Sequence, residues 1–181
     1  MAKLSELNSE EDFQYGNVFT VESGNGWSRL KIGPNGNYIQ LLDHLSEKWS
    51  TPEYYLLYVS LVSHTGKNPG RYESPILSKD DLDVFLYSHK DFLEKFGGQH
   101  LWIGHPENND LLIYDQHNVI FAYGNIVGYK DVLTVEKFSE GSFSIPCPHS
   151  HSYEPSLTLH EGDLFAHFNW VYSELRDGDA Y

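Results

Sequence analysis

Short connections between apolar segments are the feature that most constrains this fold. Residues 100–105, 111–115 and 119–123 each favour strands, and only the short polar segments 106–110 and 116–118 separate them. Parallel neighbouring strands need a crossover of roughly a dozen residues or more, whereas antiparallel strands need only a tight turn. The sequence therefore predicts that these segments form an antiparallel meander.

Further stretches have strand character. Residues 17–21 and 27–32 flank a Gly-Asn-Gly turn at 24–26, and these residue types tolerate the positive φ of a hairpin turn. The segment 54–63 is aromatic and β-branched with almost no polar alternation, which is typical of a strand buried on both faces. A shorter alternating stretch predicts a strand at 142–145. We therefore expect an N-terminal hairpin and a well-protected strand in the sheet interior.

Helical spacing of apolar side chains, next to residues that commonly bound helices, predicts helices in four places. The expected helices span 38–49, 79–96, 129–138 and 159–176. The second has Ser78 as its N-cap and the pair Gly97-Gly98 as a left-handed stop. For the last, Thr158 and Glu161 have the spacing of a capping box. The third stretch fits neither the helical nor the strand period well, and a short helix is favoured there.

Together these elements predict an α+β fold. We expect a mainly antiparallel sheet of about five to seven strands with about three or four helices packed mostly on one face. A chain of 181 residues fits one domain, with a core large enough to fold without a disulfide or metal. Residues 1–15 are expected to form a flexible acidic lead-in, and residues 16–181 a single α+β domain.

The chain carries a strong negative charge. Lys and Arg number 12 against 26 Asp and Glu, which gives a formal net charge of −14 with neutral histidine. Such a surface repels phosphate backbones and anionic lipid headgroups, so binding to nucleic acid or to a membrane is not expected. A basic protein partner would be attracted, and exposed Tyr and Trp side chains could anchor it.

The cysteine count and the apolar stretches bear on the cellular compartment. Cys147 is the only cysteine, so no intramolecular disulfide can form, which fits a reducing compartment. Residues 1–12 lack the basic region followed by an apolar region that a secretory signal requires. The apolar stretch 54–62 is far shorter than the roughly 20 residues of a membrane helix. We therefore expect a cytoplasmic protein.

The segment 146–151, Pro-Cys-Pro-His-Ser-His, is the candidate metal site of the sequence. Residues two apart in an extended chain project to the same side, so Cys147, His149 and His151 could point a thiolate and two imidazoles into one space. Zinc accepts this set of ligands, and a catalytic zinc keeps a fourth position open for water. The competing interpretation is a proline-rich loop with exposed histidines.

Other polar residues have a structural interpretation. His89 lies on the apolar stripe of the expected 79–96 helix, where burial would lower its pKa. Asp115 and His117 flank a hairpin turn, and we expect them to shape it. The last expected helix has a polar face predicted to meet solvent. The members of that face are His160, Asp163, His167, Trp170 and Glu174.

Two functions follow from these observations. The favoured one is a non-enzymatic acidic protein that docks on a basic protein. In composition the chain is similar to the immunity proteins that neutralise bacterial toxins, a resemblance that no motif carries. The alternative is a metal-assisted hydrolase or small-molecule binder that uses Cys147, His149 and His151, joined by His100, His105 or the last helix. A nucleophile motif of the G-x-S-x-G type does not occur in the sequence.

Overall fold

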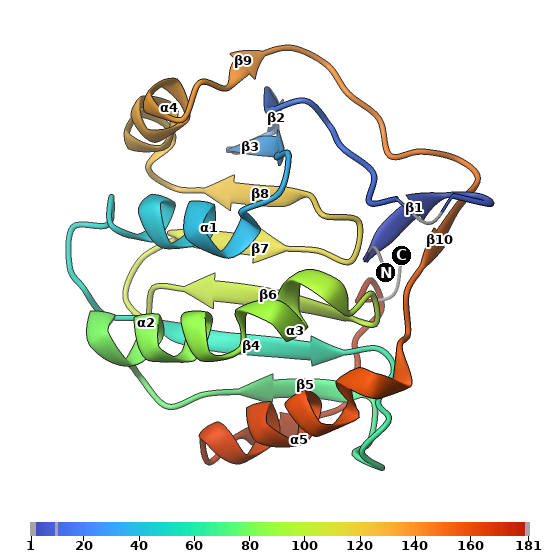
Figure 1. The fold of residues 1–181 in the computed structure, drawn as a ribbon. Helices are drawn as coiled ribbons and strands as arrows, with labels where there is room; N and C mark the ends of the chain where they lie inside the picture. The colour runs from blue at the N-terminus through green and yellow to red at the C-terminus, as the bar shows by residue number, and fades with distance from the viewer. Residues whose placement is uncertain (1–2, 10, 180–181) are drawn as a thin grey trace.

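The chain folds into an α+β structure built on a large, mostly antiparallel sheet (Figure 1). The computed structural model describes residues 3–9 and 11–179. Among these residues, nine strands form the large sheet in the order β11-β5-β4-β6-β7-β8-β3-β2-β9, and β1 and β10 form a separate two-stranded sheet. The strands are β1 (Leu4–Glu6), β2 (Val18–Gly24), β3 (Trp27–Gly33), β4 (Tyr55–Ser60), β5 (Gly70–Glu73), β6 (Gln99–Gly104), β7 (Leu111–Tyr114), β8 (Ile120–Tyr123), β9 (Ser139–Glu140), β10 (His149–His151) and β11 (Val171–Ser173).

The helices pack on one face of the large sheet. They are α1 (Tyr38–Ser46), α2 (Lys79–Ser88), α3 (Lys90–Lys95), α4 (Ile126–Val135), the 3₁₀ turn η1 (Pro155–Leu157) and α5 (Thr158–His167). In Figure 1, α1, α2 and α3 lie across the face turned toward the viewer, and buried side chains of α4 and α5 join the same core. The predicted fold class is therefore confirmed. None of the described helices is both long and apolar enough to span a membrane.

The predicted meander and hairpin are confirmed. β6, β7 and β8 are successive antiparallel neighbours, and β2 and β3 pair as a hairpin. β4 lies between β5 and β6, and neither Tyr58 nor Val59 on its two faces is exposed. The sheet has more strands than expected because the short strands β9 and β11 extend its two edges.

The pleat of the sheet separates a core face from a second face. On the core face, Leu101 and Leu112 are fully buried under the helices. Alternate residues point the other way. Trp102, Ile113 and Phe121 are cross-strand neighbours on that second face, and each is only partly buried. Apolar side chains thus cover part of the sheet on the side away from the helices.

The expected helix over residues 79–96 is interrupted at His89. Its N-terminus is as predicted, because the Ser78 side chain accepts a hydrogen bond from the backbone N–H of Asp81. At His89 the backbone has φ −109° and ψ 9°, which separates α2 from α3. The His89 ring contacts His167 of α5, with Nε2 of His89 2.9 Å from Nδ1 of His167. The break therefore lies where the helix meets α5.

The predicted left-handed stop at Gly97 and Gly98 is wrong, because neither residue has a positive φ. Gly97 is required by close packing instead. A Cβ built on Gly97 would lie 2.8 Å from Cβ of His151 and 3.0 Å from the backbone oxygens of Lys3 and Ser152. The absence of a side chain at this position lets β10 approach the end of α3.

The last helix is shorter than expected. α5 ends at His167, and Phe168 is extended, with φ −126° and ψ 164°. The chain then forms β11, which pairs with β5 at the edge of the large sheet. The predicted capping box does not form, because Glu161 is fully buried and accepts a hydrogen bond from the backbone N–H of His64. Consequently Trp170 and Glu174 do not share a helical face with His160.

The structure of α4 and of the region after it agrees only in part with the expectation from the sequence. The expected helix over 129–138 exists as α4, but residues 142–145 are not a strand. The sheet edge is extended earlier, at β9, which pairs in parallel with β2. Phe143 packs edge-on against the ring of Tyr15, with centroids 4.9 Å apart, and does not join a ladder.

The N-terminal segment takes part in the fold. Residues 1–2 and 10 of the expected lead-in, and residues 180–181 of the expected domain, lie outside the described residues. Within the described part, β1 pairs antiparallel with β10, and Leu4 is fully buried. The two-stranded sheet lies beside the β7–β8 turn at one end of the large sheet (Figure 1).

Candidate metal centre

Three histidine side chains from two distant parts of the chain meet at this end of the large sheet. His117 lies in the turn between β7 and β8, and His149 and His151 are the first and last residues of β10. One ring nitrogen from each lies within 4.8 Å of the other two. The ring centroids are 5.0 to 5.2 Å apart, and the ring planes are inclined by 59° to 87°. The three imidazoles therefore surround a common point.

Asp115 fixes both the turn and the ring of His117. Its Oδ1 accepts hydrogen bonds of 2.9 Å from the backbone N–H groups of His117 and Val119. Its Oδ2 lies 3.0 Å from Nδ1 of His117. Because a carboxylate accepts, the proton of a neutral His117 lies on Nδ1 and the lone pair on Nε2. Histidines that bind metals commonly have such a carboxylate partner.

The turn itself is closed by local hydrogen bonds. The backbone N–H of Asp115 donates to the carbonyl of Val119, 3.0 Å away. Asn118 has a φ of 60°, a left-handed conformation that asparagine tolerates better than most residues. The hydroxyl of Tyr114 donates to Oδ1 of Asn118 at 2.7 Å. These bonds close the turn that carries His117.

His149 and His151 project to the same side of β10 because residues two apart share a face of a strand. β1 pairs with β10 along the whole of this short strand. Nδ1 of His149 lies 2.7 Å from the carbonyl oxygen of Pro146 and donates to it. In a neutral His149 the lone pair is therefore on Nε2, as in His117.

The surroundings of His151 favour its neutral form. Burial, with a smaller contribution from His117 and His149, lowers the pKa of His151 to about 4. A neutral imidazole is the form that binds a metal ion. Nδ1 of His151 is buried and has no hydrogen-bond partner among the described residues. Such an atom is costly when unsatisfied, and coordination would satisfy it.

Asp115 keeps a low pKa although its side chain is buried. Burial alone would raise its pKa, but hydrogen bonding and charge interaction with His117, and the backbone N–H of Val119, hold the pKa below its ordinary value. The structure thus places a fixed negative charge directly behind one of the three imidazoles. This charge would favour a cation on the opposite side of the His117 ring.

The donor set fits zinc. Zinc–nitrogen distances are about 2.0–2.1 Å, which places ligand nitrogens about 3.4 Å apart in a tetrahedral site. From separations of up to 4.8 Å, each ring would move inward by less than about 1 Å. Three histidines and an open fourth position are also the ligand set of one class of catalytic zinc sites.

Two of the three metal ligands expected from the sequence lie in the histidine cluster. His149 and His151 lie together in the cluster, whereas Cys147 is exposed and is not part of it. His117 takes the third position. The thiol is separated from His149 by Pro148, and the peptide bond between Cys147 and Pro148 is cis.

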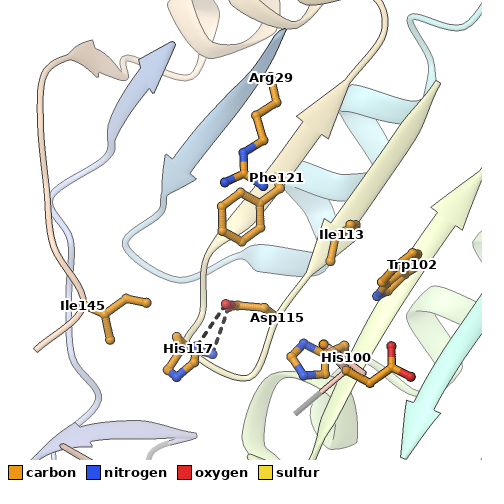
Figure 2. Close-up of a pocket in the computed structure, with 10 residues that line it drawn as sticks. Arg29, His100, Trp102, Ile113, Asp115, His117, Phe121 and Ile145 are labelled. Atoms are coloured by element: carbon orange, nitrogen blue, oxygen red, sulfur yellow. Dashed lines mark hydrogen bonds and ion pairs between the residues drawn. The ribbon is translucent and has the colours of Figure 1, made fainter. Parts of the chain in front are cut away.

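A pocket of about 310 Å³ opens beside His117 on the second face of the sheet (Figure 2). It extends along the sheet over Trp102, Ile113 and Phe121, and Ile145 closes it on the side opposite Trp102. His117 and Asp115 lie at its lower end in this view. His117 therefore belongs to both the histidine cluster and the pocket.

The charged groups that line the pocket have partners. Arg29 forms an ion pair of 2.7 Å with Glu22 and donates to the hydroxyl of Tyr123 at 2.6 Å. Its guanidinium lies over the ring of Phe121, 4.3 Å from the centroid. Asp179 pairs with Arg71 at 2.6 Å. Of the charged side chains that line the pocket, Arg29 and Asp179 are thus ion-paired, and the carboxylate of Asp115 is hydrogen bonded within the β7–β8 turn.

His100 and His105, the further histidines considered from the sequence, lie in different places. His100 lines the pocket, is 8% exposed, and its buried Nε2 has no hydrogen-bond partner among the described residues. Burial lowers the pKa of His100 to about 4. His105 instead hydrogen bonds with Thr51 and accepts from the N–H of Glu107.

The last helix does not reach the histidine cluster. His167 of α5 contacts His89, so two histidines assigned to separate surfaces in the sequence form one pair. The pair lies against the ring of Phe85. Burial lowers the pKa of His89 to about 4, and it also lowers the pKa of His167.

Comparisons with known proteins give no relative. No protein-family model matches the chain, and neither a curated protein nor a solved structure is significantly similar to it.

Proposed function

We propose that this chain binds a divalent transition-metal ion, zinc in the first place, through His117, His149 and His151. We further propose that it uses the ion to hydrolyse a small molecule bound in the adjacent pocket. The observation that carries this proposal is the convergence of three imidazoles, one of which, that of His117, also lines a pocket. Asp115, behind His117, supplies the orienting carboxylate.

The chemistry follows from the ligand set. His117, His149 and His151 would hold the ion, and a bound zinc would supply an activated water and a Lewis acid for a carbonyl. In ester or amide hydrolysis the water oxygen forms a bond with the acyl carbon. The bond from that carbon to the leaving oxygen or nitrogen breaks, and the leaving group takes up a proton from the water. The chain's own residues hold the ion and position the acyl group.

The docking of this acidic chain on a basic protein stays a prediction that rests on net charge. The hydrolase proposal has in its favour a specific arrangement of side chains, and for this reason we prefer it. The two are separable, because docking would weaken with rising salt as charges are screened, whereas zinc binding by neutral imidazoles would not.

Titration of metal-free protein with zinc tests the first part of the proposal. We expect one equivalent to bind, and we expect His117→Ala and His151→Ala each to weaken the affinity at least 100-fold. His64→Ala is the matched control, because His64 lies outside the cluster. Binding below about a tenth of an equivalent, or affinity unchanged in both cluster variants, would contradict a metal site here.

Hydrolysis of 4-nitrophenyl acetate tests the second part. The zinc-loaded protein should release 4-nitrophenol faster than the metal-free protein, and His117→Ala should abolish the difference. Tight zinc binding with no zinc-dependent release from this ester or from the matching anilide would contradict the hydrolase and leave the metal site.

A further inference from the structure

We infer that the pocket beside His117 accepts an aromatic acyl group, so that the substrate class is an ester or amide of an aromatic carboxylic acid. This inference rests on the proposed function and deepens it. The hydrolysed carbonyl would lie at the histidine end of the pocket, and the ring would extend over the second face of the sheet toward Trp102.

The shape of the wall carries the inference. Trp102, Ile113 and Phe121 are in register on three adjacent strands, so their side chains form a continuous row. Ile145 faces this row from the other side of the pocket (Figure 2). Rings favour offset or edge-to-face contact with other rings, and such contacts add to the effect of burial. A cavity of about 310 Å³ is at the small end of ligand pockets, which suits a single ring with a short acyl group.

The charge pattern excludes a strongly charged body for the ligand. Of the lining charges, Arg29 and Asp179 are already paired with Glu22 and Arg71, and the carboxylate of Asp115 accepts hydrogen bonds from the β7–β8 turn. A charged substituent would have to break one of these pairs, which is costly in a partly buried site. At the histidine end, by contrast, a zinc ion would attract an oxygen or an oxyanion. The apolar pocket would thus hold an aryl group, and the zinc ion would bind the carbonyl attached to it.

His100 provides the pocket with a hydrogen-bonding group. It is more than nine-tenths buried, lines the pocket, and its Nε2 has no partner among the described residues. Buried polar atoms of this kind are usually satisfied by a water or a ligand. A neutral imidazole can donate or accept, so it could hydrogen bond with a substituent on the ring or with a water next to it.

Three hydroxamic acids test the inference on zinc-loaded protein. Acetohydroxamic, hexanohydroxamic and benzohydroxamic acid share one zinc-chelating group and differ in having a methyl, an aliphatic or an aryl group. By calorimetric titration we expect benzohydroxamic acid to bind at least tenfold more tightly than acetohydroxamic acid, and more tightly than hexanohydroxamic acid. Equal affinity of the aryl and methyl compounds, or a preference for the aliphatic one, would overturn the inference.

Two variants locate the aryl group. Trp102→Ala removes part of the pocket wall. Ile145→Trp fills the pocket with a larger side chain. Because Ile145 lies outside the helices and strands, Ile145→Trp is the variant to use if Trp102→Ala does not fold. Either should reduce the aryl preference to near unity while zinc affinity is unchanged. Tyr172→Ala, an exposed aromatic on the same sheet, is the control. A preference that persists in both pocket variants overturns the inference. Failure of zinc to bind the wild-type chain would instead overturn the proposed function, and this inference with it.

Discussion

Nδ1 of His117 lies 3.0 Å from Oδ2 of Asp115, and the other oxygen of the same carboxylate accepts two backbone N–H groups of the turn. A single buried side chain thus shapes the β7–β8 turn and sets the orientation of an imidazole. Carboxylates in this relation to a histidine make the ring a better metal ligand and hold it in one tautomer.

Asp115→Asn should weaken zinc affinity by about 10–100-fold while the turn persists. The amide oxygen can still accept the backbone N–H groups, but the amide nitrogen donates, so it opposes the tautomer with the proton on Nδ1 of His117. Competition with a chromophoric zinc chelator measures the affinity. Asp163→Asn, on α5 and away from the cluster, is the control. Equal affinities of the two variants would show that the carboxylate does not act through His117.

Gly97→Ala should destabilise the fold and weaken zinc binding together. The added methyl would lie 2.8 Å from Cβ of His151, so β10 must move. Overpacking of this kind costs about 1–3 kcal/mol in the free energy of unfolding. The matched variant is Gly162→Ala, on α5, where an added Cβ has nothing within 4 Å and should stabilise the helix by about 0.5–1 kcal/mol. Urea unfolding and zinc titration of both variants give the comparison, and an unchanged zinc affinity in Gly97→Ala would contradict the placement of β10.

Cys147→Ser should leave zinc affinity within about twofold of the wild type, since the thiol is exposed and outside the histidine cluster. This variant separates the ligand set of the structure from the one expected from the sequence. The same titration, with His149→Ala beside it, provides the measurement. If Cys147→Ser lost affinity as strongly as His149→Ala, the thiolate would be a ligand and the three histidines would not be the complete ligand set.

Acidification should destabilise the chain through His89. Burial, then the neighbouring His167, lowers the pKa of His89 to about 4, while in the unfolded chain it is about 6.5. As the pH falls from about 6.5 to 4, the unfolded state binds more protons than the folded state, so the free energy of unfolding decreases. Above this range the contribution is fully present.

The measurement is the slope of the free energy of unfolding against pH, obtained from urea unfolding of metal-free protein between pH 7.5 and 4.5. His89→Gln should have a shallower slope than the wild type. A slope unchanged by His89→Gln would mean that the imidazole is protonated as readily in the folded chain as in the unfolded one.

Local patterns predicted the parts of the fold that local interactions determine. The meander of β6, β7 and β8 and the β2–β3 hairpin follow from connection length and turn residues, which are legible in a single sequence. The break at His89 and the strand after His167 were not predictable in this way. Both depend on where α5 packs against α2 and on the free edge of β5, which are contacts between residues distant in sequence.

In the candidate site, too, local sequence patterns predicted some features, and contacts between distant residues determine the others. The spacing of His149 and His151 indicated that they share one side of an extended segment. Asp115 and His117 were expected to shape a turn, and Asp115 does so. Nothing in the local sequence indicates that β1 would hold β10 against this turn, which is what brings His117 to the other two histidines. The Asp-x-His pattern at a hairpin turn is the only local signal that could have identified the third imidazole.

Anomalous diffraction at the zinc absorption edge, from crystals of zinc-loaded protein, tests the central claim most directly. The account predicts one strong peak about 2.0–2.1 Å from a ring nitrogen of each of His117, His149 and His151, with the fourth position open toward Trp102 and Ile145. A peak bonded to Cys147, or zinc bound only elsewhere on the acidic surface, would contradict it.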